Sequence, residues 1–193
     1  MAISTTTDIT TLTTSDIAGL SNTEIARLTL DQIDDLSTAQ IQAFSNTQFP
    51  QFSTIQVPEF SARQLAALTT AQIDSMGTAD LAALTDDQWR VFSLPQLTAL
   101  NSKQIAALTT TDLLALSPGQ WTGFTSDQLA RLTSSQIQNL SSRLANLTSG
   151  QINNLTTAFL AAMGSDQWRS LSVTQIQSLK PSQISKITTN SIA

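Results

Sequence analysis

The side chains that could carry out chemistry in this sequence are fourteen carboxylates and a large number of hydroxyls and amides. Carboxylates can act as general acids or bases, and they bind calcium where several oxygens converge on one point. Cysteine and histidine are both absent. Their absence removes disulfides, thiolate sites, Ser-His-Asp and Cys-His catalysis, and the commonest transition-metal ligand.

The spacing of the carboxylates is that of a repeat rather than that of a site. Asp86 and Asp87 are adjacent, and Asp31, Asp34 and Asp35 form a second group, but neither group lies in a D-x-D-x-D loop. Most acidic residues instead fall in the first turn of an expected helix, where they complement the helix dipole. We therefore expect no metal site, no cofactor and no enzymatic activity.

The elements that position these groups are eight-residue repeats, which we call octads and number from position 1 at Thr5. Seventeen octads run to Leu140, a seven-residue block occupies 141–147, and five more octads occupy 148–187. Positions 5 and 8 are apolar in all 22 octads, and position 1 is Ser or Thr in 18. Position 4 is Gln in 16 and Asp or Glu in five, with Phe159 as the exception.

This pattern predicts one short helix in each octad. Ser or Thr at position 1 and Gln, Asp or Glu at position 4 form a capping box, and the preceding position 8 with position 5 forms a hydrophobic staple. A continuous helix would wind its apolar stripe around the axis, and a strand would place positions 5 and 8 on opposite faces. We predict an all-α solenoid with one capped mini-helix per octad; a β-solenoid stays the alternative, because Thr and Ile favour strands.

We expect residues 1–193 to form a single solenoid with two irregular segments, 44–60 and 141–163. The first is expected to be kinked and packed by aromatic rings, because it holds two prolines at position 6 and four phenylalanines: Pro50, Pro58, Phe44, Phe49, Phe52 and Phe60. The second contains the seven-residue block, which we interpret as lacking a position-4 residue, and Phe159. The three tryptophans, Trp89, Trp121 and Trp168, occupy position 5 and are expected to fill the core.

Composition limits the partners of the chain. Its formal net charge is −5, whereas nucleic-acid binding needs a basic face. The apolar residues are spread too evenly for an 18-residue membrane span, so we expect neither nucleic-acid binding nor membrane insertion. The N-terminal stretch has no basic region followed by an apolar one, and no signal peptide is seen there.

The strings LTTAQI, LTSSQI, LTTTDL and LSVTQI resemble the tandem L-T-T-x-Q-I-x-x-L tracts of very large repetitive bacterial proteins, many of them surface or secreted ones. The resemblance covers nearly the whole chain. It implies an extracellular or cell-surface location and a structural or adhesive role, and it assigns no functional residue.

The ends of the array suggest self-assembly. Ile9 and Leu12 occupy core positions in the first octad, and Ile184, Ile187 and Ile192 do so in the last units, with no polar capping unit apparent. Residues 1–90 carry 11 acids and three bases, a net of −8, while residues 91–193 carry three acids and six bases, a net of +3. We predict a structural protein that assembles with itself, head to tail, into a fibre or surface scaffold. The alternative is a binding module for ice or carbohydrate that uses the Thr-rich surface or segment 44–60.

Overall fold

The computed structural model describes residues 3–185 and 187, and every regular element in these residues is a short helix. The predicted all-α solenoid of mini-helices is thus confirmed, and the described residues contain no strand. The chain divides into two compact units, which we call the N-terminal unit, Met1–Ala99, and the C-terminal unit, Leu100–Ala193. One uninterrupted array over 1–193 stays a prediction.

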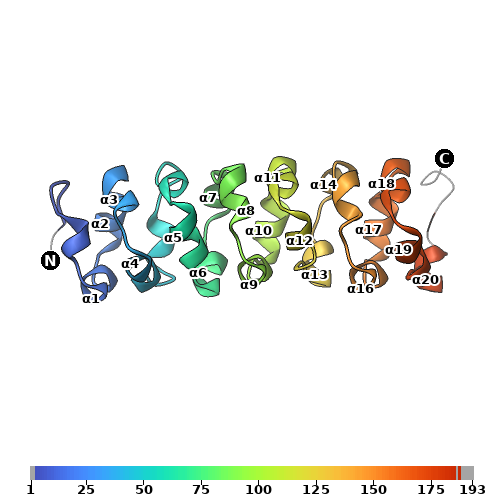
Figure 1. The fold of residues 1–193 in the computed structure, drawn as a ribbon, viewed down its shortest axis with the longest axis horizontal. Helices are drawn as coiled ribbons and strands as arrows, with labels where there is room; N and C mark the ends of the chain where they lie inside the picture. The colour runs from blue at the N-terminus through green and yellow to red at the C-terminus, as the bar shows by residue number, and fades with distance from the viewer. Residues whose placement is uncertain (1–2, 186, 188–193) are drawn as a thin grey trace. The chain divides into compact units, whose positions relative to one another are not determined.

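The N-terminal unit is built from nine α-helices, which are labelled in Figure 1, and three 3-10 helices, which we name η. In chain order they are η1 (Ile9–Thr11), α1 (Thr14–Ala18), α2 (Asn22–Ala26), α3 (Leu30–Asp34), α4 (Thr38–Ala43), η2 (Phe49–Gln51), η3 (Val57–Glu59), α5 (Ala62–Ala67), α6 (Thr70–Ser75), α7 (Thr78–Ala82), α8 (Asp86–Arg90) and α9 (Leu94–Thr98).

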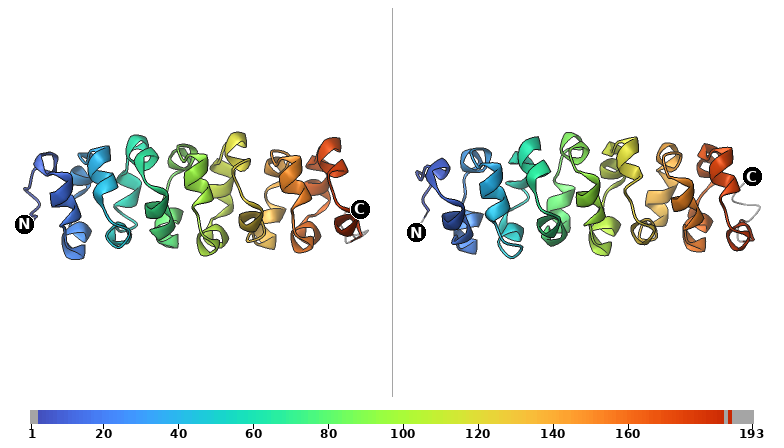
Figure 2. Two further views of the ribbon diagram at one scale, coloured as in Figure 1. Left: turned by 90° about the horizontal axis from the view of Figure 1, so that it is seen from below. Right: turned by 60° about the horizontal axis from the view of Figure 1, so that its bottom comes forward.

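The described part of the C-terminal unit holds eleven α-helices. They are α10 (Ser102–Ala107), α11 (Thr110–Ala115), α12 (Pro118–Trp121), α13 (Ser126–Leu129), α14 (Ser134–Gln138), α15 (Ser141–Leu144), α16 (Ser149–Asn153), α17 (Thr157–Ala162), α18 (Ser165–Ser170), α19 (Val173–Gln177) and α20 (Pro181–Ile184). Within each unit, successive helices wind around a common axis as the turns of a coil (Figure 2).

The helix α6 shows how one octad folds. Thr69 precedes the helix in an extended conformation; its hydroxyl accepts from the Gln72 N–H at 3.2 Å, and its own N–H donates to Gln72 Oε1 at 2.9 Å. This is the predicted capping box. The helix ends at Ser75, and Met76 after it is again extended, so that the next octad can start at once.

The two apolar positions of each octad build the core. Ile73 at position 5 is 0% exposed and Met76 at position 8 is 4% exposed. Burying such a side chain contributes about 1.5–3 kcal/mol. A helix of five or six residues has no stability of its own in water, so this packing between octads is what keeps each helix folded.

A second set of bonds, made by the position-4 glutamines, links successive turns of the solenoid. Gln72 Nε2 donates to the carbonyl oxygens of Ile41 at 2.7 Å and Phe44 at 2.9 Å, which lie 31 and 28 residues earlier. The same offsets recur at other glutamines in both units, including Gln40, Gln56, Gln64, Gln96, Gln136, Gln175 and Gln183. We call the pair of bonds from one such side chain a glutamine rung. Each rung joins a capping box to the carbonyls that end the octad four places earlier.

The rungs and the helix contacts together give the length of one turn. Helices three octads apart pack on each other, as α1 does on α4 and α14 on α17. The rungs reach four octads back. One superhelical turn therefore takes between three and four octads, a value that the sequence pattern alone does not provide.

Segment 44–60 contains two 3-10 helices and a cluster of phenylalanine rings, and a kink there stays a prediction. Pro50 and Pro58 lack the N–H that an α-helix needs at position 6, and 3-10 helices, η2 and η3, replace α-helices there. The ring of Phe52 lies edge-on to those of Phe44 and Phe60, with centroids 5.1 Å apart in both pairs. The prolines shorten the helices and the rings fill the space.

The seven-residue block differs from its sequence interpretation. Helix α15 starts directly after Leu140, with no side-chain cap, so the residue that is missing is the one at position 1. Arg143 precedes the buried Leu144 as glutamine precedes isoleucine elsewhere, and its guanidinium donates to the carbonyl of Leu114 in the preceding turn. Position 4 is thus present, and a cation there supplies the donor that the glutamine supplies in other octads.

Candidate functional site

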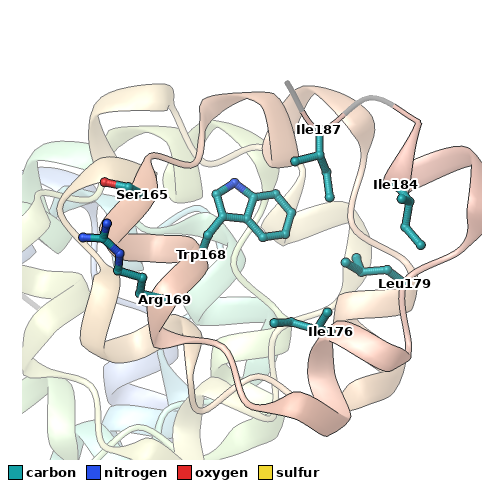
Figure 3. Close-up of a pocket in the computed structure, with 7 residues that line it drawn as sticks. All are labelled: Ser165, Trp168, Arg169, Ile176, Leu179, Ile184 and Ile187. Atoms are coloured by element: carbon teal, nitrogen blue, oxygen red, sulfur yellow. The ribbon is translucent and has the colours of Figure 1, made fainter. Parts of the chain in front are cut away.

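The described residues of the C-terminal unit include an apolar hollow of about 520 Å³. It lies between α18, α19 and α20, and Figure 3 shows the Trp168 ring and four aliphatic side chains turned toward it. The lining residues are Ser165, Trp168, Arg169, Ile176, Leu179, Ile184 and Ile187. We call this feature the C-terminal hollow.

The hollow exists because core positions become exposed over these octads. Position-5 residues within the array are fully covered: Ile105 and Ile152 are each 0% exposed. By contrast, Ile176 is 45% exposed and Ile184 is 53% exposed, although both occupy position 5. These side chains have the pattern of a core, but no described residues of a following turn cover them.

The structure places the five predicted end residues differently from one another. Ile9 and Leu12 are buried, at 1% and 7% exposure, and offer little apolar surface. Ile184 is exposed and Ile187 is partly exposed, and both line the C-terminal hollow. Ile192 lies outside the described residues. A contact of these residues with another chain stays a prediction.

Residues 3–7 are hydrogen-bonded to the third and fourth octads of the N-terminal unit. Gln32 Nε2 donates to the carbonyls of Ser4 at 3.0 Å and Thr7 at 2.9 Å, and the Ile3 N–H donates to Glu24 Oε1 at 3.0 Å. These bonds hold residues 3–7 over the first octads. Ile9, in the same octad as Thr7, is as buried as core residues further along the N-terminal unit.

Carboxylates replace glutamine at position 4 in the first three octads, at Asp8, Asp16 and Glu24. Asp16 Oδ2 accepts from the Thr13 hydroxyl at 2.6 Å and from its N–H at 2.9 Å, so it closes the capping box as glutamine does. These hydrogen bonds lower the pKa of Asp16 below its ordinary value. A carboxylate has no hydrogen to donate, so these three residues form caps but no rungs.

A further acid at position 4 is Asp80, in α7, which is half-buried. Burial raises the pKa of Asp80, and a hydrogen bond from the Gly77 N–H partly offsets that rise. A Cβ at residue 77 would lie 2.7 Å from Asp80 Oδ2. Glycine at the cap position therefore leaves room for the carboxylate to fold back onto the backbone.

We expect Glu24 to make the N-terminal turn sensitive to acid. The Ser21 hydroxyl, the Ser21 N–H and the Ile3 N–H all donate to this carboxylate, and they lower its pKa to about 2 from 4.5. Because the folded pKa is the lower one, the stabilisation is complete above about pH 4.5 and is lost as the pH falls toward 2. Titration of the Glu24 carboxyl carbon by NMR should show the low pKa, and Glu24→Gln should remove this share of the acid dependence of thermal stability. A normal pKa for Glu24 would show that these bonds do not form.

The phenylalanines of segment 44–60 and the tryptophans are buried and have little surface that a ligand could contact. Phe44, Phe49, Phe52 and Phe60 are each 2% exposed, and Trp89 and Trp121 are 0% exposed. The prediction that tryptophan at position 5 fills the core is confirmed, with Trp168 at 7% exposure also forming one wall of the C-terminal hollow. No ring of segment 44–60 presents a face on which a sugar could stack.

The glutamine side chains are the residues whose second role the sequence interpretation missed. We expected them only to complete capping boxes, for which glutamate serves equally well. The signal that could have revealed the rungs is the ratio at position 4, where 16 glutamines stand against five acids. An amide can accept from the cap and donate to carbonyls at the same time, whereas a carboxylate can only accept.

Comparison with protein families identifies the repeat in the C-terminal unit. Residues 108–142 and 144–181 match the ALTTAQ repeat. The two matches are in tandem, and the break between them falls at Arg143, in the seven-residue block. The ALTTAQ match thus supports a repeat family over this part of the chain. A comparison with curated proteins gave no match.

The second ALTTAQ segment contains a complete rung. Gln175 lies in the second match, and its Nε2 donates to the carbonyl of Leu147 at 2.6 Å and to that of Leu144 at 3.2 Å. Within residues 3–185 and 187, no helix is long and apolar enough to cross a membrane, and no three acidic side chains gather where they could hold a metal ion.

Proposed function

We propose that this chain is a non-enzymatic structural protein that assembles with itself, head to tail, into a fibre or a surface scaffold. The C-terminal hollow carries the proposal. Inside the array, each set of position-5 and position-8 side chains is covered by the following turn of the same repeat. The hollow is such a set with its apolar side chains exposed, and exposed apolar patches of this kind mark interaction surfaces.

The opposite charges of the two ends support the head-to-tail direction. The N-terminal segment 1–90 has a net charge of −8 and the segment 91–193 a net charge of +3. Contact between unlike ends is favoured electrostatically, and a heterologous contact that does not close produces a filament. An extracellular or cell-surface location, which the LTTAQI-type strings suggest, is part of this proposal.

The proposal is tested by replacing exposed side chains of the hollow with charged ones. The double variant Ile176→Asp, Ile184→Asp should remain folded, because both positions are about half exposed, and should no longer associate. Light scattering over a range of protein concentrations measures the mass, and electron microscopy shows whether filaments form.

Ile55→Asp is the matched control, since Ile55 is 71% exposed and lies in the N-terminal unit. It should leave assembly unchanged. A wild-type chain that stays monomeric at high concentration would overturn the proposal. So would a double variant that loses thermal stability as a monomer, with its mass the same as that of the wild type, because the hollow would then be covered within the same chain.

A further inference from the structure

The first turn of the N-terminal unit cannot continue the solenoid by the bonds that join its other turns. A glutamine rung needs a side-chain amide that donates to two carbonyls of the turn before it, as Gln72 does. The first three octads carry Asp8, Asp16 and Glu24 at that position. Their oxygens only accept, and carbonyl oxygens also only accept, so this turn placed against the last turn of another copy would set acceptor against acceptor.

The amide of the fourth octad is also committed. Gln32 Nε2 already donates to the carbonyls of Ser4 and Thr7 in its own chain. A second copy therefore has no rung donor to offer from its first turn. A head-to-tail joint must draw its hydrogen-bond donors from the other side of the contact.

The C-terminal hollow has cationic donors beside it. Arg169 lines the hollow, and its side chain is 71% exposed. It lies 3.9 Å from Asp166, a loose and exposed pair that leaves the guanidinium accessible. Lys180 directly follows the lining residue Leu179 and precedes α20 as its N-cap, at position 1, where 18 of the 22 octads have Ser or Thr. Its side chain is exposed, and its Nζ lies 3.4 Å from Asn154 Oδ1.

We propose that the first turn of a second copy occupies the C-terminal hollow, and that its carboxylates Asp8, Asp16 and Glu24 pair with Arg169 and Lys180 around the apolar contact. This inference rests on the proposed head-to-tail assembly and names the residues of its joint. The joint between copies is then a set of charge-assisted hydrogen bonds, chemically distinct from the neutral rungs within a chain. Ile3, partly exposed beside Glu24, is the apolar side chain that the first turn brings to the hollow.

This chemistry also gives the ends specificity. A turn with three successive carboxylates would set them against carbonyls at a glutamine-lined junction of the interior, where position-4 acids occur only singly, at Asp80 and Asp112. It is accepted where Arg169 and Lys180 supply donors. Copies would thus join at their ends and would not insert between turns of a neighbouring solenoid.

The decisive experiment exchanges acids for amides in the first turn. The triple variant Asp8→Asn, Asp16→Asn, Glu24→Gln retains a cap acceptor at each site and restores amide donors. If the joint is ionic, this variant should associate at least about tenfold more weakly than the wild type, as measured by sedimentation equilibrium. If the joint is made of rungs, the variant should associate more tightly, and that result would overturn the inference.

Charge reversal at the hollow tests the other side of the joint. Arg169→Glu with Lys180→Glu should weaken association by a similar factor, while the matched control Lys103→Glu with Arg131→Glu, two exposed bases of the same unit, should not. Association of the wild type should also weaken between about 0.05 M and about 1 M salt, because surface charges are screened. Circular dichroism verifies that each variant is folded.

The failures of the two proposals are distinguishable. A wild-type chain that associates with equal affinity at all salt concentrations and in every charge variant overturns the ionic joint and leaves the head-to-tail function standing. A wild-type chain that stays monomeric under all conditions overturns the proposed function itself.

Discussion

Gln136→Glu should destabilise the protein by about 3–5 kcal/mol at neutral pH, the range for an uncompensated buried charge. Gln136 is 5% exposed; its Oε1 accepts from the Thr133 N–H at 2.6 Å, and its Nε2 donates to the carbonyls of Leu108 at 2.6 Å and Ile105 at 3.3 Å. Glutamate preserves the cap but turns the rung donor into a charged acceptor that faces two carbonyls. Urea unfolding followed by circular dichroism measures the loss.

The same helix provides the control. Gln138 lies two residues further along α14 and is exposed, so Gln138→Glu makes the same chemical change on the surface and should shift stability by no more than about 0.5 kcal/mol. Burial raises the pKa of a glutamate placed at 136. The difference in stability between the two variants should therefore shrink as the pH falls toward the pKa of a free glutamate, about 4.3. Equal effects of the two variants would mean that the capping box, and not the rung, accounts for the glutamines.

Ile73→Ala should destabilise the protein by about 2–5 kcal/mol, because it removes three carbons from a fully buried site and leaves a cavity. Ile73 is 0% exposed and stands at position 5 of α6. The octads on either side are held by short helices whose ends are fixed by hydrogen bonds, so the site has little freedom to collapse. Thermal or urea unfolding of the purified variant gives the value.

Ile55→Ala is the matched comparison, since the same atoms are removed from a side chain that is 71% exposed in the same unit. Its effect should be within about 0.5 kcal/mol. A small effect at both positions would contradict a core built from the position-5 column.

The local structure of this protein is encoded within each octad, which is why the sequence predicts it. In α6, for example, five residues hold all the local signals. Thr69 is the cap, the Gln72 side chain bonds back to it, and Ile73 is one partner of the hydrophobic staple. Their hydrogen bonds depend on φ, ψ and side-chain length alone. The prolines at 50 and 58 act through their own missing N–H groups, so the loss of α-helix in these two octads also follows from the local sequence.

The register of the seven-residue block could not be predicted from the sequence. Deleting the cap position or deleting position 4 gives strings of the same length, and the sequence does not separate the two. The contact of Arg143 with the carbonyl of Leu114, 29 residues earlier, is what identifies the missing position. A local pattern could not supply that contact.

The sequence by itself determined the mini-helices, their caps, the two core columns and the absence of cysteine and histidine chemistry, because each depends on neighbours within one octad or on composition. The tertiary structure alone decided the length of a turn, the rungs, the burial of Ile9 and the exposure of Ile176 and Ile184. These depend on which octads lie against each other after some 28 to 31 residues of chain have wound around the axis. Small angles at each capping box add up over that distance, and nothing within a single octad fixes their sum.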